Sequence, residues 1–179
     1  VPKYYIIPQE WIDVINILKI HGCSYYTQPS DSVINAVTYK FKNVKFSSMP
    51  YEGRFQPTFM IDTFNTEKLI RKGDYVFPTD QNLLGVLVYL LEPLTNDSFV
   101  KWGFFNSIFE QKEYFEVYSV EPIAEKMYKE NINLRKEFLE KIKNDSEFAK
   151  DSYARLDFFY KQSEYYDKKH NIYPILLIY

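Results

Sequence analysis

Two histidines and one cysteine are the residues of this sequence best suited to metal or nucleophilic chemistry. Catalytic zinc is held by His, Glu, Asp or Cys, usually with two of the ligands close together in sequence. No carboxylate follows His21 or His170 at three-residue spacing, and no His-Glu-x-x-His motif occurs. The sequence therefore predicts no metal ligand and no catalytic residue in this chain.

Cys23 lies two residues after His21, which invites comparison with a cysteine nucleophile. However, Cys23 follows the expected C-terminal end of a helix, where the helix dipole opposes formation of a thiolate. We therefore predict a structural thiol. Because Cys23 is the only cysteine, an internal disulfide is excluded.

Three glutamates, Glu110, Glu113 and Glu116, recur at three-residue spacing. On a helix they would share one face, which is compatible with a cation or acid–base site and equally with a solvated surface; we favour the solvated surface. Neither a phosphate-binding glycine loop nor a Gly-x-Ser-x-Gly nucleophile motif is present.

The segment Tyr51-Glu52-Gly53-Arg54 is the best candidate for a binding site. Glu52 and Arg54 flank a glycine in an expected loop, where an ion pair between them would shape the turn. Alternatively, Arg54 would bind a carboxylate through two parallel hydrogen bonds. We favour the ion pair, and Tyr51, Glu52 and Arg54 remain the candidate substrate-binding residues.

The composition narrows the classes of partner. Apolar residues make up 46% of the chain and the net charge is −2, so a sizeable core is expected and a nucleic-acid partner is not. Aromatic residues make up 19%, which we attribute mainly to core packing. The other interpretation is an aromatic platform for sugar rings or peptide side chains, to which the run Trp102-Gly-Phe-Phe-Asn106 would contribute. The longest apolar run, residues 83–91, is well short of the ~20 residues that a membrane span requires.

The pattern of apolar residues predicts an α+β fold in a single domain, residues 1–179. Residues 1–30 are expected to form a β-α-β unit, with a strand at residues 4–7, a helix at residues 9–21 closed by Gly22, and a strand at residues 24–27. Residues 31–118 should form a mostly antiparallel sheet, from strands near residues 33–41, 55–64 and 75–77. A buried helix should follow, with Thr79 as its N-cap and with Leu87 and Leu90 in the main core.

Residues 119–179 are expected to form a helical part that ends in a strand at residues 173–179. Pro122 fits the first position of one helix, and Asn133 and Asp151 are expected to cap two more. The chain begins at Val1 without a leader segment, so we expect it to be part of a longer protein.

Several short motifs resemble the C-terminal region of bacterial zinc carboxypeptidase-like proteins of the carboxypeptidase A superfamily. They are Tyr5-Ile-Ile-Pro8, Leu18-Lys-Ile-His-Gly22, Tyr51-Glu-Gly-Arg54, Asp80-Gln81, Leu90-Leu-Glu-Pro93, Asp97-Ser98, Trp102-Gly-Phe-Phe-Asn106, Phe109-Glu110, Glu113-Tyr114, Glu121-Pro122, Phe158-Phe-Tyr160 and Tyr173-Pro174. The resemblance implies an upstream catalytic domain with one zinc held by two His and one Glu, a further Glu as general base, and export to the periplasm or cell surface. None of those catalytic positions maps onto this chain.

Three hypotheses about function follow. The leading one is a non-catalytic C-terminal accessory domain that packs on the upstream catalytic domain of the same chain and shapes it, with zinc only in that domain. The alternative is a glycan- or peptide-binding module that uses surface aromatics. The third is an independent enzyme built on Glu110, Glu113 and Tyr114.

Overall fold

The computed structural model describes residues 1–111 and 114–179, which form two compact units. Unit 1 consists of Val1–Glu110 together with Lys169–Tyr179, and unit 2 consists of Gln111–Lys168. Unit 1 is therefore built from two separate stretches of the chain.

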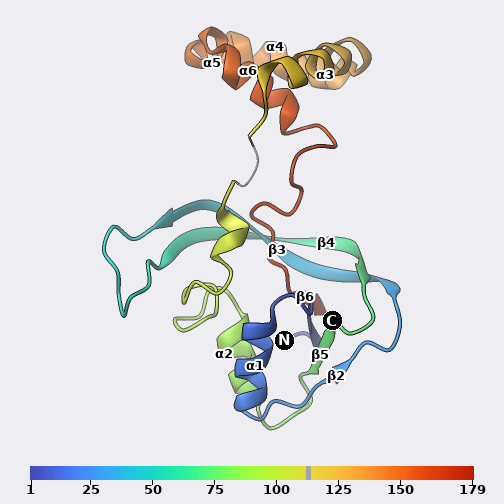
Figure 1. Ribbon diagram of the computed structural model, residues 1–179, viewed down its shortest axis with the longest axis vertical. Helices are drawn as coiled ribbons and strands as arrows, with labels where there is room; N and C mark the ends of the chain where they lie inside the picture. Colours follow the sequence, from blue (N-terminus) through green and yellow to red (C-terminus); the bar gives the residue numbers. More distant parts are fainter. Residues whose placement is uncertain (112–113) are drawn as a thin grey trace. The chain divides into compact units, whose positions relative to one another are not determined.

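Unit 1 is built on a six-stranded sheet in the order β2-β5-β1-β6-β3-β4, in which every neighbouring pair is antiparallel. The strands are β1 (Tyr4–Ile7), β2 (Tyr26–Thr27), β3 (Ser32–Phe46), β4 (Pro57–Ile70), β5 (Tyr75–Pro78) and β6 (Leu176–Ile178). Strand β6, from the end of the chain, lies between β1 and β3, so residues far apart in sequence close the middle of the sheet (Figure 1).

Helices α1 (Ile12–Ile20) and α2 (Leu84–Leu91) contribute to the main core of unit 1 (Figure 1). The core combines buried residues of both helices, Leu18 and Leu87 among them, with alternate residues of the strands, such as Phe41 and Phe77. Gly22 adopts a φ of +83° just after α1, the left-handed conformation that favours glycine at a helix end.

Strands β3 and β4 form a hairpin that extends beyond the rest of the sheet (Figure 1). Their register pairs Phe41 with Ile61, and Phe59 and Ile61 pack against the core while Met60 points away. An irregularity lies between Lys42 and Lys45, where β3 bulges before the turn.

Unit 2 is helical and contains α3 (Val117–Glu130), α4 (Ile132–Asn144), α5 (Ser146–Lys150) and α6 (Ser152–Tyr160). Its small core includes Ala124, Leu134 and Phe159. The last three helices are each capped by a side-chain oxygen, from Asn131, Asp145 and Asp151 respectively. These caps explain how short helices follow one another with single-residue connections.

The structure confirms the predicted α+β class, the N-terminal β-α-β unit, the antiparallel sheet and the helical C-terminal part. The N-cap of Asp151 is confirmed as well, since its Oδ1 accepts a hydrogen bond from the N–H of Ala154. Among the described residues, every helix is too short or too polar to cross a lipid bilayer.

Several predicted helix boundaries are wrong. Thr79 does not cap α2, which begins at Leu84; its hydroxyl donates to the carbonyl of Pro2 instead. Pro122 lies inside α3, which begins five residues earlier at Val117. Asn131, and not Asn133, caps α4.

The run of glutamates does not form a continuous helix. Glu110 follows the short 3-10 helix η1 (Asn106–Phe109), Glu116 precedes α3, and both have extended backbone. Glu113 lies outside the described residues.

Candidate functional site

The predicted loop at residues 51–54 is the turn of the β3–β4 hairpin. Tyr51 N–H donates to the Arg54 carbonyl, and Arg54 N–H donates to the Tyr51 carbonyl, both over 2.9 Å. The two central residues, Glu52 and Gly53, have φ of 48° and 74°, the combination that a type I′ turn requires. Glycine adopts this conformation freely, whereas the left-handed conformation costs a glutamate on the order of 1 kcal/mol. A strained residue at an exposed turn is one mark of a functional position.

Two aromatic residues from a distant part of unit 1 support this turn. The ring centroids of Tyr51 and Trp102 are 6.3 Å apart, and the guanidinium carbon of Arg54 lies 5.9 Å from the ring centroid of Phe104. Trp102 and Phe104 belong to the irregular segment after α2. The contact of Arg54 with an aromatic ring is a cation–π interaction, which orients the guanidinium while leaving its N–H groups free.

Glu52 and Arg54 form no ion pair with each other or with any other described residue. The expected ion pair therefore does not shape the turn; the backbone hydrogen bonds between Tyr51 and Arg54 do. Both charged side chains are exposed. The tip thus offers an unpaired carboxylate and an unpaired guanidinium to a ligand.

Asp97 holds the polar edge of Trp102 and that of one further aromatic residue, Tyr89. Its Oδ1 accepts a hydrogen bond from Nε1 of Trp102 over 3.1 Å, and its Oδ2 accepts one from the hydroxyl of Tyr89 over 2.9 Å. The hydrogen bond to the carboxylate raises the pKa of Tyr89. Because both polar edges are bonded to Asp97, these rings offer their faces to a ligand.

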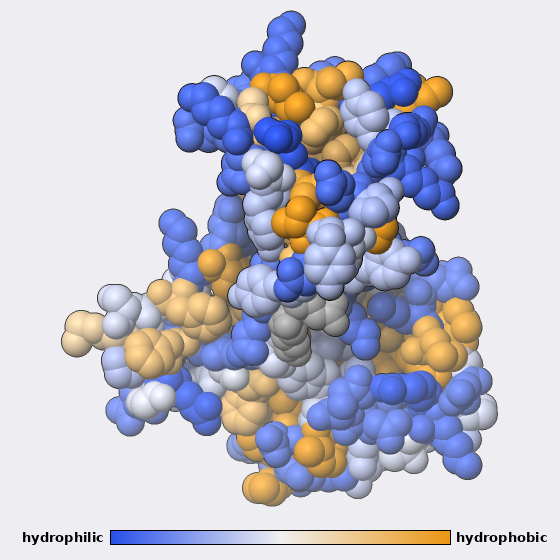
Figure 2. Space-filling view, turned by 45° about the horizontal axis from the view of Figure 1, so that its top comes forward, coloured by the Kyte–Doolittle hydropathy of each residue, from blue (hydrophilic) through white to orange (hydrophobic). Residues whose placement is uncertain are grey.

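We refer to Tyr51, Glu52, Arg54, Tyr89, Asp97, Trp102 and Phe104 as the hairpin-tip site. The sequence predicts Tyr51, Glu52 and Arg54 as binding residues and indicates the aromatic run of residues 102–106, but no pattern in it connects Tyr89 or Asp97 with them. Figure 2 shows apolar side chains at the projecting end of the hairpin, at the left of the view. The arrangement of ring faces with free donors and acceptors is suited to binding, whereas nothing in it activates a nucleophile.

A second polar cluster lies inside unit 1, at the end of α2. The hydroxyls of Tyr5 and Tyr39 donate to the two carboxylate oxygens of Glu92, over 2.5 and 2.7 Å. The hydroxyl of Tyr173 donates to the carbonyl of Leu91 over 2.6 Å. Burial, followed by the neighbouring carboxylate, raises the pKa of all three tyrosines well above the usual value. Neutral tyrosines that satisfy a part-buried carboxylate stabilise the fold.

The residues with potential for metal or thiol chemistry are not gathered into a site. Among the described residues, no group of three or more His, Cys, Asp or Glu side chains lies close enough to hold a metal ion. The zinc centre that the family resemblance implies belongs to an upstream catalytic domain, so its presence there stays a prediction. Cys23 is buried and unbonded, and burial raises the pKa of its thiol, which suits the predicted structural role.

The comparison with known proteins gives a partial relationship. No family model matches the chain, and no solved structure matches it. Three fungal proteins named Carboxypeptidase 2, from Trichophyton tonsurans, Trichophyton rubrum and Trichophyton equinum, are each 30% identical to it over 104 residues. The aligned part is 57% of this chain but only 19% of each relative. The chain is thus distantly similar to part of a carboxypeptidase, and it spans about a fifth of the length of the curated relatives it matches.

Proposed function

We propose that this chain is a non-catalytic accessory region of a larger carboxypeptidase-like protein, in which it packs on the catalytic domain and helps to shape the approach of the substrate. Zinc would then belong to the catalytic domain, and the whole protein would be exported to the periplasm or cell surface of a bacterium. The distant similarity to proteins named Carboxypeptidase 2 supports the carboxypeptidase part of this proposal.

One observation carries the proposed role of the surface. The hairpin tip holds an unpaired Arg54 and an unpaired Glu52 on an exposed turn, and the rings of Trp102 and Phe104 support that turn. A peptide offers a carboxylate, an amine and backbone amides, which are groups that these two side chains can bind. An accessory region that presents such a turn can hold a peptide near a neighbouring active site.

Alanine variants of the hairpin-tip site in the longer protein test this role. We expect Glu52→Ala and Arg54→Ala each to lower kcat/KM for peptide substrates by about tenfold, the loss of one hydrogen bond to a charged group. Lys68→Ala is the matched control, because Lys68 is an exposed charged residue of β4 away from the turn. Unchanged turnover in both hairpin-tip variants would remove these residues from the substrate path and leave the accessory role standing.

The alternative is a glycan- or peptide-binding module, and the fixed rings at the hairpin tip favour it. Tyr51 is 60% exposed, and Asp97 anchors the edges of Trp102 and Tyr89, so ring faces are available for stacking. In this case Trp102 fluorescence should change when the chain is titrated with an oligosaccharide, and the change should be lost in Trp102→Phe. An unaltered signal counts against the glycan form of this alternative.

A further inference from the structure

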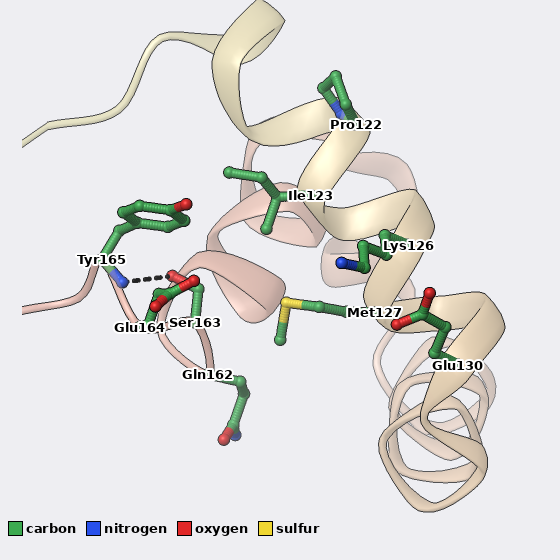
Figure 3. Close-up of a pocket in the computed structure, with 9 residues that line it drawn as sticks. All are labelled: Pro122, Ile123, Lys126, Met127, Glu130, Gln162, Ser163, Glu164 and Tyr165. Atoms are coloured by element: carbon green, nitrogen blue, oxygen red, sulfur yellow. Dashed lines mark hydrogen bonds between the residues drawn. The ribbon is translucent and has the colours of Figure 1, made fainter.

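Unit 2 contains a groove that the proposed function does not use. The groove has a volume of about 460 Å³ and runs between α3 and the segment that follows α6 (Figure 3). Its α3 wall carries Pro122, Ile123, Lys126, Met127 and Glu130, and its other wall carries Gln162, Ser163, Glu164 and Tyr165. Met127 and Ile123 point from α3 toward the opposite wall. A volume of this size is in the range of sites that hold small ligands or short peptide segments.

The walls of the groove are fixed by interactions within unit 2. Ser163 is only 7% exposed; its hydroxyl donates to the Tyr160 carbonyl over 2.7 Å and accepts from the N–H of Tyr165 over 3.3 Å. On the other side, Ala124 is buried in the core of unit 2, with Met127 packed against that core. The groove is therefore preformed, and a ligand would not have to order it.

The charged side chains at the rim of the groove have no partner among the described residues. Lys126, Glu130 and Glu164 form no hydrogen bond or ion pair with another described residue, although Lys126 and Glu130 are one helical turn apart. Lys129, which lies between them on α3, is paired with Glu125 and does not line the groove. The rim thus carries two free carboxylates and one free ammonium group, an excess of negative charge.

Two features favour a cationic ligand over an anionic one. Glu130 is the last residue of α3, where the carbonyl groups of the helix end attract positive charge. On the α3 wall, the apolar side chains of Ile123 and Met127 can pack against the aliphatic stem of a lysine or arginine. The flexible side chain of Met127 can also adapt to a neighbouring apolar side chain.

The groove continues past the end of α3. A second hollow of about 520 Å³ shares Met127 and Glu130 with the first and extends along residues 131–133. An elongated hollow fits an extended chain better than a compact small molecule.

We propose that this groove binds a short extended peptide segment that carries a basic residue next to an apolar one. The basic side chain lies between Glu130 and Glu164, the apolar side chain packs on Ile123 and Met127, and the ammonium group of Lys126 binds a peptide carbonyl. This site is independent of the hairpin-tip site and of the proposed accessory role.

The test uses a short synthetic peptide, blocked at both ends, with one lysine between two leucines. Titration of the chain with methyl-labelled methionine should shift the NMR signal of Met127, and a peptide with glutamate in place of lysine should bind at least fivefold more weakly. The variants Glu130→Gln and Glu164→Gln should each weaken binding of the lysine peptide about two- to fivefold, as expected for exposed ion pairs. Glu140→Gln, an exposed change on α4 outside the groove, should have no effect.

Three outcomes overturn the proposal: no shift of the Met127 signal with the lysine peptide, equal binding of the lysine and glutamate peptides to the unmodified chain, or unchanged affinity in both groove variants. The comparison of the two peptides needs no variant, so it remains decisive if a substitution disturbs folding.

Discussion

Glu92 connects three parts of unit 1 through its hydrogen bonds. It ends α2, and its two oxygens accept from Tyr5 of β1 and Tyr39 of β3. The negative end of a helix is an unfavourable place for a carboxylate. Two short hydrogen bonds from neutral tyrosine hydroxyls offset that cost. A tyrosine can donate such a hydrogen bond only while it keeps its proton.

The tyrosine cluster predicts a loss of stability at alkaline pH. In the folded chain the pKa of Tyr5, Tyr39 and Tyr173 is raised, so the unfolded chain releases these protons first, near a pH of about 10. Above that pH the unfolded state binds fewer protons, and the free energy of unfolding should fall by up to about 1.4 kcal/mol per pH unit for each tyrosine. Below a pH of about 10 the tyrosines keep their protons in both states, so the stabilisation that the cluster provides is fully present there.

Urea unfolding at several pH values between neutral and strongly alkaline measures this effect. Tyr5→Phe should flatten the decline at high pH, although it lowers stability at neutral pH by removing a partner of Glu92. Phe77→Leu is the control, because it perturbs the same core without removing a titrating group. An equally steep decline in Tyr5→Phe would contradict the assigned role of the cluster.

The candidate site was predictable from the sequence only in part. Glu52 and Arg54 around Gly53 stood out because a glycine between opposite charges is typical of a turn. Their contacts with Trp102 and Phe104 could not be predicted, because they depend on where a long hairpin places its tip. The hydrogen bonds of Asp97 bridge the end of α2 to the next segment, and no periodic pattern signals them.

At the scale of elements, α2 shows how a helix boundary decides which residues are buried. Leu87 is fully buried as predicted, whereas Leu90, also predicted to be buried, is only partly buried. Leu91 is the second fully buried leucine of α2. The sequence of α2 is apolar almost throughout, so composition did not distinguish these positions. The start at Leu84, rather than after Thr79, leaves only two turns of helix against the core.

Truncation of the leucines in α2 should follow burial. Leu87→Ala is expected to lower the free energy of unfolding by roughly 2–5 kcal/mol, the usual range for a buried leucine, and Leu90→Ala by clearly less. Chemical denaturation of both variants measures the difference. A loss below ~1 kcal/mol in Leu87→Ala would mean that α2 contributes little to the core.

The N-caps of the helices in unit 2 also could be predicted from the sequence only in part. Asp151 was predicted because a single Asp precedes an apolar helical pattern there. The Asn131-Ile-Asn133 segment offers two asparagines, and only the backbone shows that Asn131 accepts from the N–H of Leu134. Pro122 suggested a helix start, but α3 tolerates it inside the helix at the loss of one backbone hydrogen bond.

At the scale of the molecule, changes of periodicity divide the sequence at residues 30 and 118, whereas the contacts of the folded chain divide it at residues 110 and 168. The two differ because β6 returns from the end of the chain to pair with β1 and β3. A strand of three residues cannot reveal its partners from sequence, since pairing depends on the rest of the sheet.

We propose that this chain serves a catalytic domain elsewhere in a larger carboxypeptidase-like protein and does not itself carry out the chemistry. The most direct measurement compares this chain with the longer protein for zinc content and for release of C-terminal residues from peptides. We predict that the longer protein binds zinc and cleaves, while this chain does neither, because a tight zinc site needs about three converging protein ligands. Stoichiometric zinc binding by this chain at submicromolar affinity, lost on His21→Ala, would contradict the claim.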